Sequence, residues 1–272
     1  MTFNVKKELQ RFLSEDIGKG DITSSLLSEK KITARIISRE KALVAGVDFA
    51  KQIFNLKGCN VKIVKKDGQQ VLPNQTIMTI TGNARNILTC ERTALNLLTR
   101  MSGIATQTNQ LVLKIPNKKT KIYATRKTAP GLRFFDKEAV KIGGGERHRL
   151  TLDEMVMIKD NHIAIEGSLL KLIREAKKKY KKFEVEVENN QDALLAAKEG
   201  ASIIMLDNFT PSQIKKTIQS LKKENLRDKV KLEASGGITS KNISQYAKTG
   251  VDIISVGSIT NSVKGIDVSL EI

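Results

Sequence analysis

The chain has little of the residue types that mark several common classes of protein. Its 272 residues include no Trp, two Cys, two His and four Pro. Cys59 and Cys90 are too few for a disulfide framework and lack the spacing of a metal site, so we expect both to be buried, reduced and chemically inert. With three Tyr, eight Phe and no recognisable nucleic-acid module, the sequence does not favour nucleic acid as a partner.

Long apolar runs are also absent. No stretch approaches the ~20 apolar residues that a membrane span needs. The N-terminal segment MTFNVKKELQRFLSEDIG is amphipathic and lacks the apolar core of a signal peptide. We therefore expect a soluble, cytoplasmic protein with no membrane partner.

Positive charge is what the chain has in excess. Lys and Arg number 47 against 29 Asp and Glu, a net charge of +18, which predicts acidic partners or substrates. Runs such as 177–182 are typical of a solvated helix face. The cluster in 125–162 differs, because it surrounds a Pro-Gly turn and the triple glycine 143–145, and it predicts a site for a densely anionic ligand. Its basic residues are Arg126, Lys127, Arg133, Lys137, Arg147, His148, Arg149 and Lys159.

Within this cluster, some residues fit two interpretations. Arg133 and Lys137 fit either a surface helix or the site. His162 fits either a site residue or the cap of a following helix. The triple glycine resembles a phosphate cradle, but a close-packed turn is the favoured interpretation.

The second half of the chain predicts a parallel barrel. Apolar, β-prone runs alternate with helical segments, which is the pattern of strand–helix units around a parallel sheet. Ligands bind such barrels at the carboxyl ends of the strands. We expect Lys127, Lys159, Glu188, Asp207, Ser235 and Gly257 at those ends. The runs are 121–127, 155–162, 183–189, 202–208, 230–237 and 251–258.

The first hundred residues predict a small α/β sandwich. Segments 32–46 and 61–82 read as strands, and 46–56 reads as a short helix. A long helical pattern follows over 87–115, with one apolar stripe that includes Cys90 and Leu98, and Ser102-Gly103 is expected to interrupt it. The predicted domains are a sandwich over 1–105, joined by the tail 262–272, and an α/β barrel over 106–261.

Several segments resemble one family. They are EDIGKGDITS, GNARNILTCERTALNLLTRMSGIATQT, TRKTAPGLR, GGGERHRLTLDEMVMIKDNH, EVEVEN, IMLDN, LEASGGI and ISVGSITNS. In this order they resemble quinolinate phosphoribosyltransferase, also called nicotinate-nucleotide pyrophosphorylase (carboxylating), and the match spans residues 15 to 269. The resemblance implies an N-terminal α/β sandwich followed by an incomplete α/β barrel. It also implies a homo-oligomer, either a dimer or a hexamer of dimers.

The resemblance also implies an activity. Enzymes of this family join quinolinate to 5-phosphoribosyl 1-pyrophosphate with Mg²⁺, and they release pyrophosphate and carbon dioxide to leave nicotinate mononucleotide for NAD biosynthesis. Two alternatives stay open. One is a phosphoribosyltransferase for another pyridine carboxylate, such as nicotinate. The other is a non-enzymatic protein that binds polyanions through its positive charge.

Residue roles follow from the same resemblance. Arg126, His148 and Arg149, beside Thr125, are expected to hold quinolinate, together with Arg92 from a neighbouring subunit. Lys127 and Lys159 are expected to bind pyrophosphate and to stabilise charge on it as it leaves. These two lysines, with Glu186 and Asp207, are the expected catalytic residues.

Acids and glycines complete the expected site. Glu186 and Asp207 are expected to hold the ribose hydroxyls of the donor and its Mg²⁺, whose preferred ligands are oxygens. Ser235, Gly236 and Gly237 end one strand before a helix expected near 239–240, and Gly257 and Ser258 end the next. Loops after the last two strands commonly bind phosphate in such barrels.

The chain departs from the family pattern at a few positions. Many relatives have Asn at the position of Arg147, Gly at that of Thr151 and His at that of Asn261. The last difference removes a potential donor near the phosphates.

Overall fold

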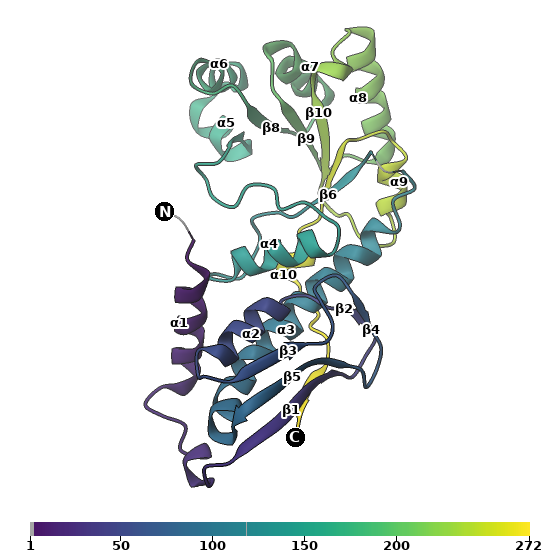
Figure 1. The fold of residues 1–272 in the computed structure, drawn as a ribbon. Helices are drawn as coiled ribbons and strands as arrows, with labels where there is room; N and C mark the ends of the chain where they lie inside the picture. The colour runs from purple at the N-terminus through teal and green to yellow at the C-terminus, as the bar shows by residue number, and fades with distance from the viewer. Residues whose placement is uncertain (1–2, 118) are drawn as a thin grey trace. The chain divides into compact units, whose positions relative to one another are not determined.

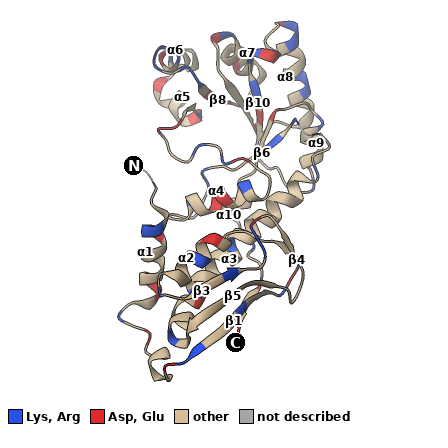
Figure 2. Cartoon of the chain, viewed as in Figure 1, with Lys and Arg blue, Asp and Glu red and all other residues tan. Residues whose placement is uncertain are grey.

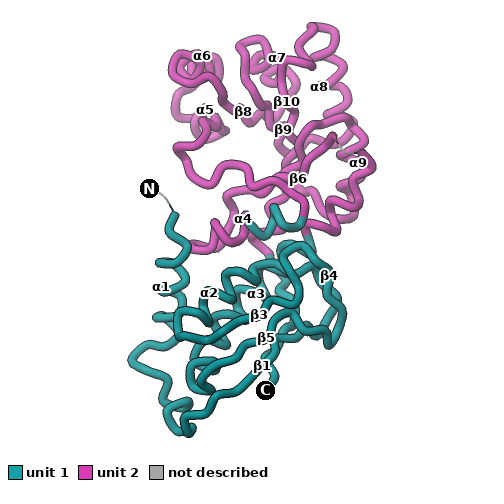
Figure 3. Tube along the Cα trace, viewed as in Figure 1, with its two compact units in different colours: residues 1–107, 138–143, 263–272 teal, residues 108–137, 144–262 magenta. Residues whose placement is uncertain are grey.

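The computed structural model describes residues 3–117 and 119–272. Its contacts group the chain into two units (Figure 3). Unit 1 contains residues 1–107, 138–143 and 263–272, and unit 2 contains residues 108–137 and 144–262. Among the described residues, no helix combines the length and the apolar character that crossing a bilayer requires.

Unit 2 contains the predicted parallel sheet. Its six strands lie in the order β6-β11-β10-β9-β8-β7, and the paired strands are parallel (Figure 1). Strands β6 and β7 are consecutive in the sequence but lie at opposite edges of the sheet, so the barrel is open between them. The expected incomplete α/β barrel is confirmed. The strands are β6 (Lys121–Tyr123), β7 (Val156–Ile158), β8 (Phe183–Val187), β9 (Ile203–Asp207), β10 (Lys231–Ser235) and β11 (Ile253–Ser255).

Helices follow the strands as the sequence pattern predicts. Local signals fix where several of them begin. The side chain of Ser168 accepts a hydrogen bond from the Lys171 amide at the start of α6, and Thr210 caps α8, where Pro211 occupies the first turn. The helices are α4 (Arg133–Ile142), α5 (Asp160–Glu166), α6 (Leu169–Lys179), α7 (Asn190–Glu199), α8 (Pro211–Lys223), α9 (Ile243–Ala247) and α10 (Ser258–Asn261).

Side chains along the strands alternate between the helix layer and the inside of the sheet. On β8, Phe183, Val185 and Val187 are buried apolar residues, while Glu184 and Glu186 occupy the alternate positions. The inner face of this barrel therefore carries carboxylates, whereas an apolar interior is the usual way to fill a small barrel.

Unit 1 is built on a four-stranded antiparallel sheet in the order β12-β1-β5-β3, with α2 and α3 over one face (Figure 1). Its last strand, β12, comes from the C-terminal end of the chain. The elements are α1 (Val5–Ile17), β1 (Lys31–Ser38), β2 (Ala42–Leu43), α2 (Val47–Asn55), β3 (Asn60–Ile63), β4 (Gln70–Val71), β5 (Thr76–Asn83), α3 (Ala84–Val112) and β12 (Val268–Glu271). The two cysteines are free and buried, as expected.

The helix α3 corrects one prediction. Ser102-Gly103 does not interrupt it, because the helix runs without a break from Ala84 to Val112. A Cβ on Gly103 would lie 2.2 Å from the carbonyl oxygen of Lys264, so this glycine permits a close backbone approach. Ser102 is buried and exchanges hydrogen bonds with the backbone of Ala45. Ser102 and Gly103 are small because neighbouring backbone packs closely against the helix at this point. The same two residue types also occur where a helix breaks, so local sequence does not distinguish the two cases.

Candidate active site

One pocket of unit 2 gathers most of the predicted site residues. Its volume is about 370 Å³, and it lies at the carboxyl ends of the strands. Its lining residues are inward-facing residues of the strands and residues of the loops that follow them. It is lined by Ala124, Thr125, Arg126, Lys127, His148, Arg149, Met157, Lys159, Glu186, Met205, Asp207, Glu233, Ser235 and Ser255.

Six residues expected at the strand ends or in the site do not line this pocket. Glu188, which follows β8, is exposed. Gly257 lies close behind it, since a Cβ there would come within 3.3 Å of Lys127 Cδ. Gly236 and Gly237 adopt φ of +92° and +60° in the turn after β10, and Ser258 is the first residue of α10. Arg92 is an exposed residue of α3 in unit 1.

The turn after β10 also differs from expectation. The next helix begins at Ile243, later than the expected 239–240. The Asn242 side chain accepts a hydrogen bond from the Thr239 amide at 2.7 Å and donates to the Gly237 carbonyl at 3.1 Å. These bonds hold 237–242 as a turn, so phosphate binding here would depend on loop amides and not on a helix end.

Two guanidinium groups give the pocket its cationic side. Arg149 donates to the carbonyl of Met155 at 2.9 Å and to the sulfur of Met157, which fixes its direction. The Nε atoms of Arg126 and Arg149 are buried without a protein partner. Buried guanidinium donors need acceptors, and carboxylates match their planar geometry.

His148 lies between the cations and the acids. Its φ of +53° is in the left-handed region, a conformation that costs a non-glycine residue energy and therefore marks a constrained position. Its Nε2 lies 3.1 Å from Glu184 Oε2, and its ring lies 5.5 Å from that of Tyr123. Burial lowers the pKa of His148, which favours a neutral imidazole. A hydrogen-bonded substrate contact suits this geometry better than a proton shuttle.

The predicted acids face the cations from the central strands. Glu186 on β8 pairs with Lys159, which follows β7. Asp207 at the end of β9 accepts a hydrogen bond from the Asn208 side chain at 2.7 Å. One pocket therefore holds guanidinium and ammonium groups opposite two carboxylates.

Sequence reasoning missed two carboxyl groups. Glu233 and Glu184 are fully buried, and burial raises the pKa of each to about 8. Glu233 Oε1 accepts a hydrogen bond from Ser255 Oγ at 2.5 Å, while Glu233 Oε2 has no protein partner. A glutamate between apolar residues in the run KLEAS was the available signal. The other lining residues that the sequence does not predict are Ala124, Met157, Met205 and Ser255.

The buried Glu233 makes stability depend on pH. Its pKa rises from 4.5 in the unfolded chain to about 8 on folding. Between these values the unfolded chain has lost the proton that the folded chain keeps, so the free energy of unfolding falls as pH rises, by up to about 1.4 kcal/mol per pH unit for this group. We expect urea denaturation to show that Glu233→Gln gains stability over the wild type between about pH 5 and 8. Parallel pH curves for the two proteins would contradict this.

Lys137 is not a surface residue. Its side chain is fully buried, with 0% of its surface accessible, and burial lowers its pKa to about 8. Its Nζ donates to the carbonyls of Arg147, at 2.6 Å, and Arg149. Arg133 donates to Thr128 Oγ1 and to the Leu150 carbonyl. Both residues of α4 thus position the loop that carries His148.

Replacing Lys137 by methionine tests this role. We expect a loss of about 2–4 kcal/mol in the free energy of unfolding, because two buried carbonyls lose their donor. Urea denaturation measures the loss, and Lys141→Met, an exposed position on the same helix, serves as the control. Equal stability of the two variants would contradict the assignment.

The remaining cluster residues have structural roles. Gly143 continues the hydrogen bonding of α4 to Ala139, and Gly144 has φ of +92°, so the triple glycine ends a helix in a turn, as favoured. His162 Nδ1 accepts a hydrogen bond from the Lys159 amide at 3.0 Å and caps α5.

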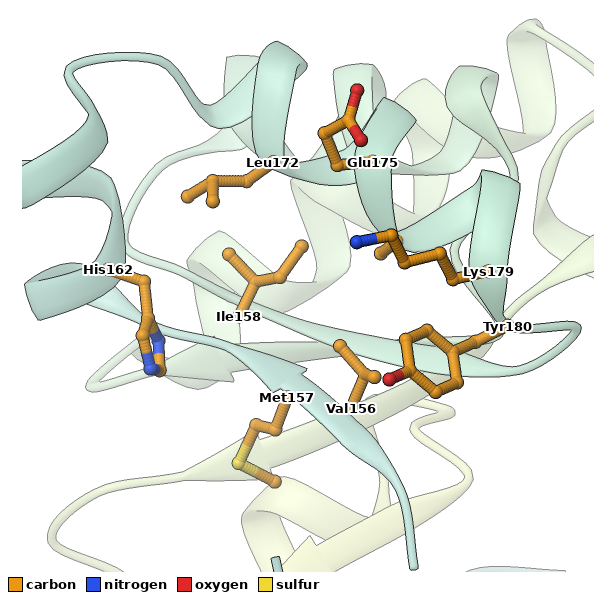
Figure 4. A pocket seen from close by; sticks show the side chains of 9 residues that line it. Val156, Met157, Ile158, His162, Leu172, Glu175, Lys179 and Tyr180 are labelled. Atoms are coloured by element: carbon orange, nitrogen blue, oxygen red, sulfur yellow. The ribbon is translucent and has the colours of Figure 1, made fainter. Parts of the chain in front are cut away.

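A second pocket, of about 280 Å³, lies beside edge strand β7 (Figure 4). Val156 and Ile158 point toward Leu172 of α6, whereas Met157 points to the other side of the strand. Unlike in the cationic pocket, apolar side chains make up about half of its lining, and Glu175 and Lys179 are its charged residues. It offers no cluster of charged groups for an anionic ligand.

Much of the positive charge lies elsewhere, on solvated helix faces. Exposed basic residues lie along α8 (Figure 2). On α6 the exposed basic residues are Lys171, Arg174, Lys177, Lys178 and Lys179. The run at 177–182 therefore has the ordinary role expected of it. The pocket cations form a separate group.

The open parallel barrel and its pocket define a class before any relative is considered. This is an α/β-barrel protein whose strand ends carry a pocket of guanidinium, ammonium and carboxylate groups, at the usual ligand-binding place of such barrels. The match to family models specifies it further. Residues 21–102 match the N-terminal domain and residues 104–271 the C-terminal domain of quinolinate phosphoribosyl transferase. The chain belongs to this family.

Individual relatives agree over nearly the whole length. A protein of Methanothermobacter thermautotrophicus named probable nicotinate-nucleotide pyrophosphorylase [carboxylating] is 44% identical over 97% of both chains. A Bacillus subtilis protein of the same name is 40% identical over 98% of this chain and 93% of its own. The solved nicotinate-nucleotide pyrophosphorylase from Francisella tularensis superposes with a TM-score of 0.91 at 42% identity, over 98% of this chain and 95% of that one.

Proposed function

We propose that this protein transfers the phosphoribosyl group of 5-phosphoribosyl 1-pyrophosphate to quinolinate with loss of carbon dioxide. The products are nicotinate mononucleotide, pyrophosphate and carbon dioxide, and the reaction is a step of de novo NAD biosynthesis. The convergence of Arg126 and Arg149 with Glu186 and Asp207 in one pocket supports this proposal most directly. Family membership adds the reaction type.

The acceptor is held by the cationic side of the pocket. Quinolinate carries two carboxylates on neighbouring ring carbons, one of them next to the ring nitrogen, and the guanidinium groups of Arg126 and Arg149 can each bind a carboxylate through two N–H donors. His148 completes the contact. Held this way, the ring nitrogen faces the anomeric carbon of the donor, and such positioning accounts for a large share of the rate.

The lysines act on the leaving group. Lys127 and Lys159 both line the pocket, and their ammonium groups would stabilise the negative charge that builds on pyrophosphate. Lys159 pairs with Glu186. Donor binding would exchange that partner for phosphate.

The acids act on the sugar and its metal. Glu186 and Asp207 offer carboxylate oxygens in a partly exposed pocket, a donor set that fits Mg²⁺. When bound, Mg²⁺ would neutralise charge on the pyrophosphate of the donor. The two carboxylates themselves would hold the ribose hydroxyls and favour the positive charge that develops on the sugar.

Phosphate of the donor has a place in the loops after β10 and β11. Ser235 lines the pocket, and Gly236 leaves no room for a side chain, since a Cβ would lie 2.1 Å from Asn208 Oδ1. Backbone amides of such glycine turns bind anions. We assign Ser235, Gly236, Gly237, Gly257 and Ser258 to the 5′-phosphate.

The chemistry needs no covalent enzyme intermediate. The ring nitrogen forms a bond to the anomeric carbon as the bond to pyrophosphate breaks. The nitrogen then carries a positive charge, which stabilises the electron pair that stays on the adjacent ring carbon when its carboxylate departs as carbon dioxide, and a proton takes the place of that carboxylate. The protein contributes orientation and electrostatic stabilisation.

Assembly and location extend the proposal. The exposed Arg92 on α3 would reach the quinolinate site of a second copy, in a dimer or a larger assembly of dimers. Exposure of an arginine on the polar face of a largely apolar helix supports this role. We expect the enzyme to work in the cytoplasm.

A single assay tests the function. The wild-type protein should release carbon dioxide from quinolinate only when the phosphoribosyl donor is present, and pyrophosphate should appear in equal amount. Nicotinate, the acceptor in the first alternative, has no second carboxylate to lose. Pyrophosphate release with nicotinate and none with quinolinate would replace the proposal by that alternative. Strong, sequence-independent binding of DNA at physiological salt without either activity would favour the polyanion-binding alternative.

A further inference from the structure

A buried carboxyl group lines the cationic pocket and has no part in the steps above. Glu233, on the central strand β10, is 0% accessible and yet contributes to the pocket wall. Ser255 Oγ donates to its Oε1 at 2.5 Å, and its Oε2 is buried without a protein partner. A negative charge here would repel a dicarboxylate substrate. The position therefore suits a neutral carboxylic acid whose proton is on Oε2.

The proposed reaction requires a proton that no residue named so far supplies. When the bond between the ring and its departing carboxylate breaks, the electron pair stays on the ring carbon next to the nitrogen. That carbon must gain a proton to give nicotinate mononucleotide. A positioned acid that begins this transfer in the transition state accelerates such steps by about 10²–10⁴-fold.

We propose that Glu233 is the general acid that protonates this ring carbon. The assignment rests on the proposed function. As carbon dioxide leaves, the proton on Glu233 Oε2 moves to the carbon, and the electron pair of the broken carbon–carbon bond forms the new C–H bond. Glu233 is left as a carboxylate, with Ser255 donating to Oε1, and it regains a proton from water after the product leaves.

Burial and the neighbouring carboxyl group of Glu184 keep Glu233 protonated before the step, against the opposing effects of other neighbours. Glu184 of β8 disfavours a second negative charge, since its carboxyl oxygen, a Glu233 oxygen and a His148 nitrogen all lie within 4.8 Å of one another. His148, from the loop before β7, and Lys159, which follows β7, favour ionisation, and Tyr123 of β6 also faces the group. Burial outweighs the effects of His148, Lys159 and the hydrogen bond from Ser255, and it raises the pKa of Glu233 to about 8.

Other pocket residues fit the role less well. His148 has its Nε2 engaged with Glu184, and burial lowers its pKa, so it carries no spare proton at neutral pH. Lys159 pairs with Glu186. The Arg126 and Arg149 guanidinium groups hold their protons too tightly to donate them.

Separating the two chemical steps tests the proposal. In a single turnover with quinolinate labelled in the carboxylate next to the nitrogen, Glu233→Gln should release pyrophosphate at the wild-type rate. Its carbon dioxide release should be slower by about 10²–10⁴-fold. The phosphoribosylated dicarboxylate should accumulate in between. Glu233→Asp, which keeps an acid on a shorter side chain, should recover part of the carbon dioxide release.

Control experiments distinguish a failure of the Glu233 proposal from a failure of the proposed function. Glu224→Gln, at an exposed position paired only with Lys198 among the ion pairs of the described chain, should behave as wild type. If Glu233→Gln releases carbon dioxide and pyrophosphate together at wild-type rates, Glu233 is not the acid. If both steps slow equally, the residue serves structure and the proposal also fails. A wild-type protein that releases no carbon dioxide from quinolinate would instead remove the proposed function.

Discussion

Arg126→Ala is expected to raise the quinolinate concentration needed for half-maximal activity by roughly two to three orders of magnitude while donor binding stays intact. The Arg126 guanidinium lines the pocket, and its buried Nε has no protein partner. Removing one member of a buried, hydrogen-bonded charge pair costs about 2–5 kcal/mol, and each 1.4 kcal/mol is tenfold in affinity. Calorimetric titration with quinolinate and with donor measures the two affinities separately.

Two further variants sharpen this result. Arg126→Lys keeps the charge but loses the planar fork, so it should recover only part of the affinity. Arg174→Ala removes an arginine whose side chain is 60% exposed on α6, and it should have no effect. Equal quinolinate affinity in Arg126→Ala and the wild type would count against the whole site assignment.

Asp207→Asn is expected to reduce turnover by about 10²–10³-fold with little change in stability. The substitution keeps the shape of the side chain and removes the charge that faces the sugar. Losing one preorganised electrostatic contact to a transition state typically costs this factor. Quinolinate affinity should remain, because the acid lies on the donor side. Steady-state kinetics over a range of Mg²⁺ concentrations measures both effects.

The comparison variant is Asp228→Asn, an exposed aspartate in the short 3-10 helix Arg227–Lys229 before β10. It should match the wild type in turnover and in Mg²⁺ dependence. A weaker apparent Mg²⁺ affinity in Asp207→Asn alone would support the role of this carboxylate near the metal. If the turnover of Asp207→Asn equals that of Asp228→Asn, Asp207 has no part in the reaction.

Much of the fold and part of the site could be predicted because they depend on local patterns. Each of the six apolar runs in the second half contains a strand of one parallel sheet. Cys90 and Leu98, on the predicted stripe of α3, are both fully buried. Arg126, Lys159 and Asp207 follow strands whose carboxyl ends meet at one edge of the sheet, so their gathering follows from the strand pattern.

The remainder depends on which segments meet in three dimensions. Lys137 has the sequence context of a helix surface and becomes buried because its ammonium group finds two loop carbonyls. Glu233 resembles any polar residue of a strand, and only its place on the inner face of the sheet shows that it cannot reach solvent. Gly103 resembles a helix break in its local sequence because its partner, Lys264, is remote along the chain.

The order of strands in the barrel places the groups for the sugar donor and the groups for the aromatic acid in different parts of the sheet. Acids come from the interior strands β8, β9 and β10, each hydrogen-bonded on both sides, whereas Arg126 and Lys159 follow β6 and β7 at the free margins. The groups that handle the sugar are therefore held in the stiffest part of the sheet. Loops at the margins can change with little disturbance to it. Redesign of those loops is the expected route to a catalyst that accepts a different aromatic acid while retaining the same activated sugar.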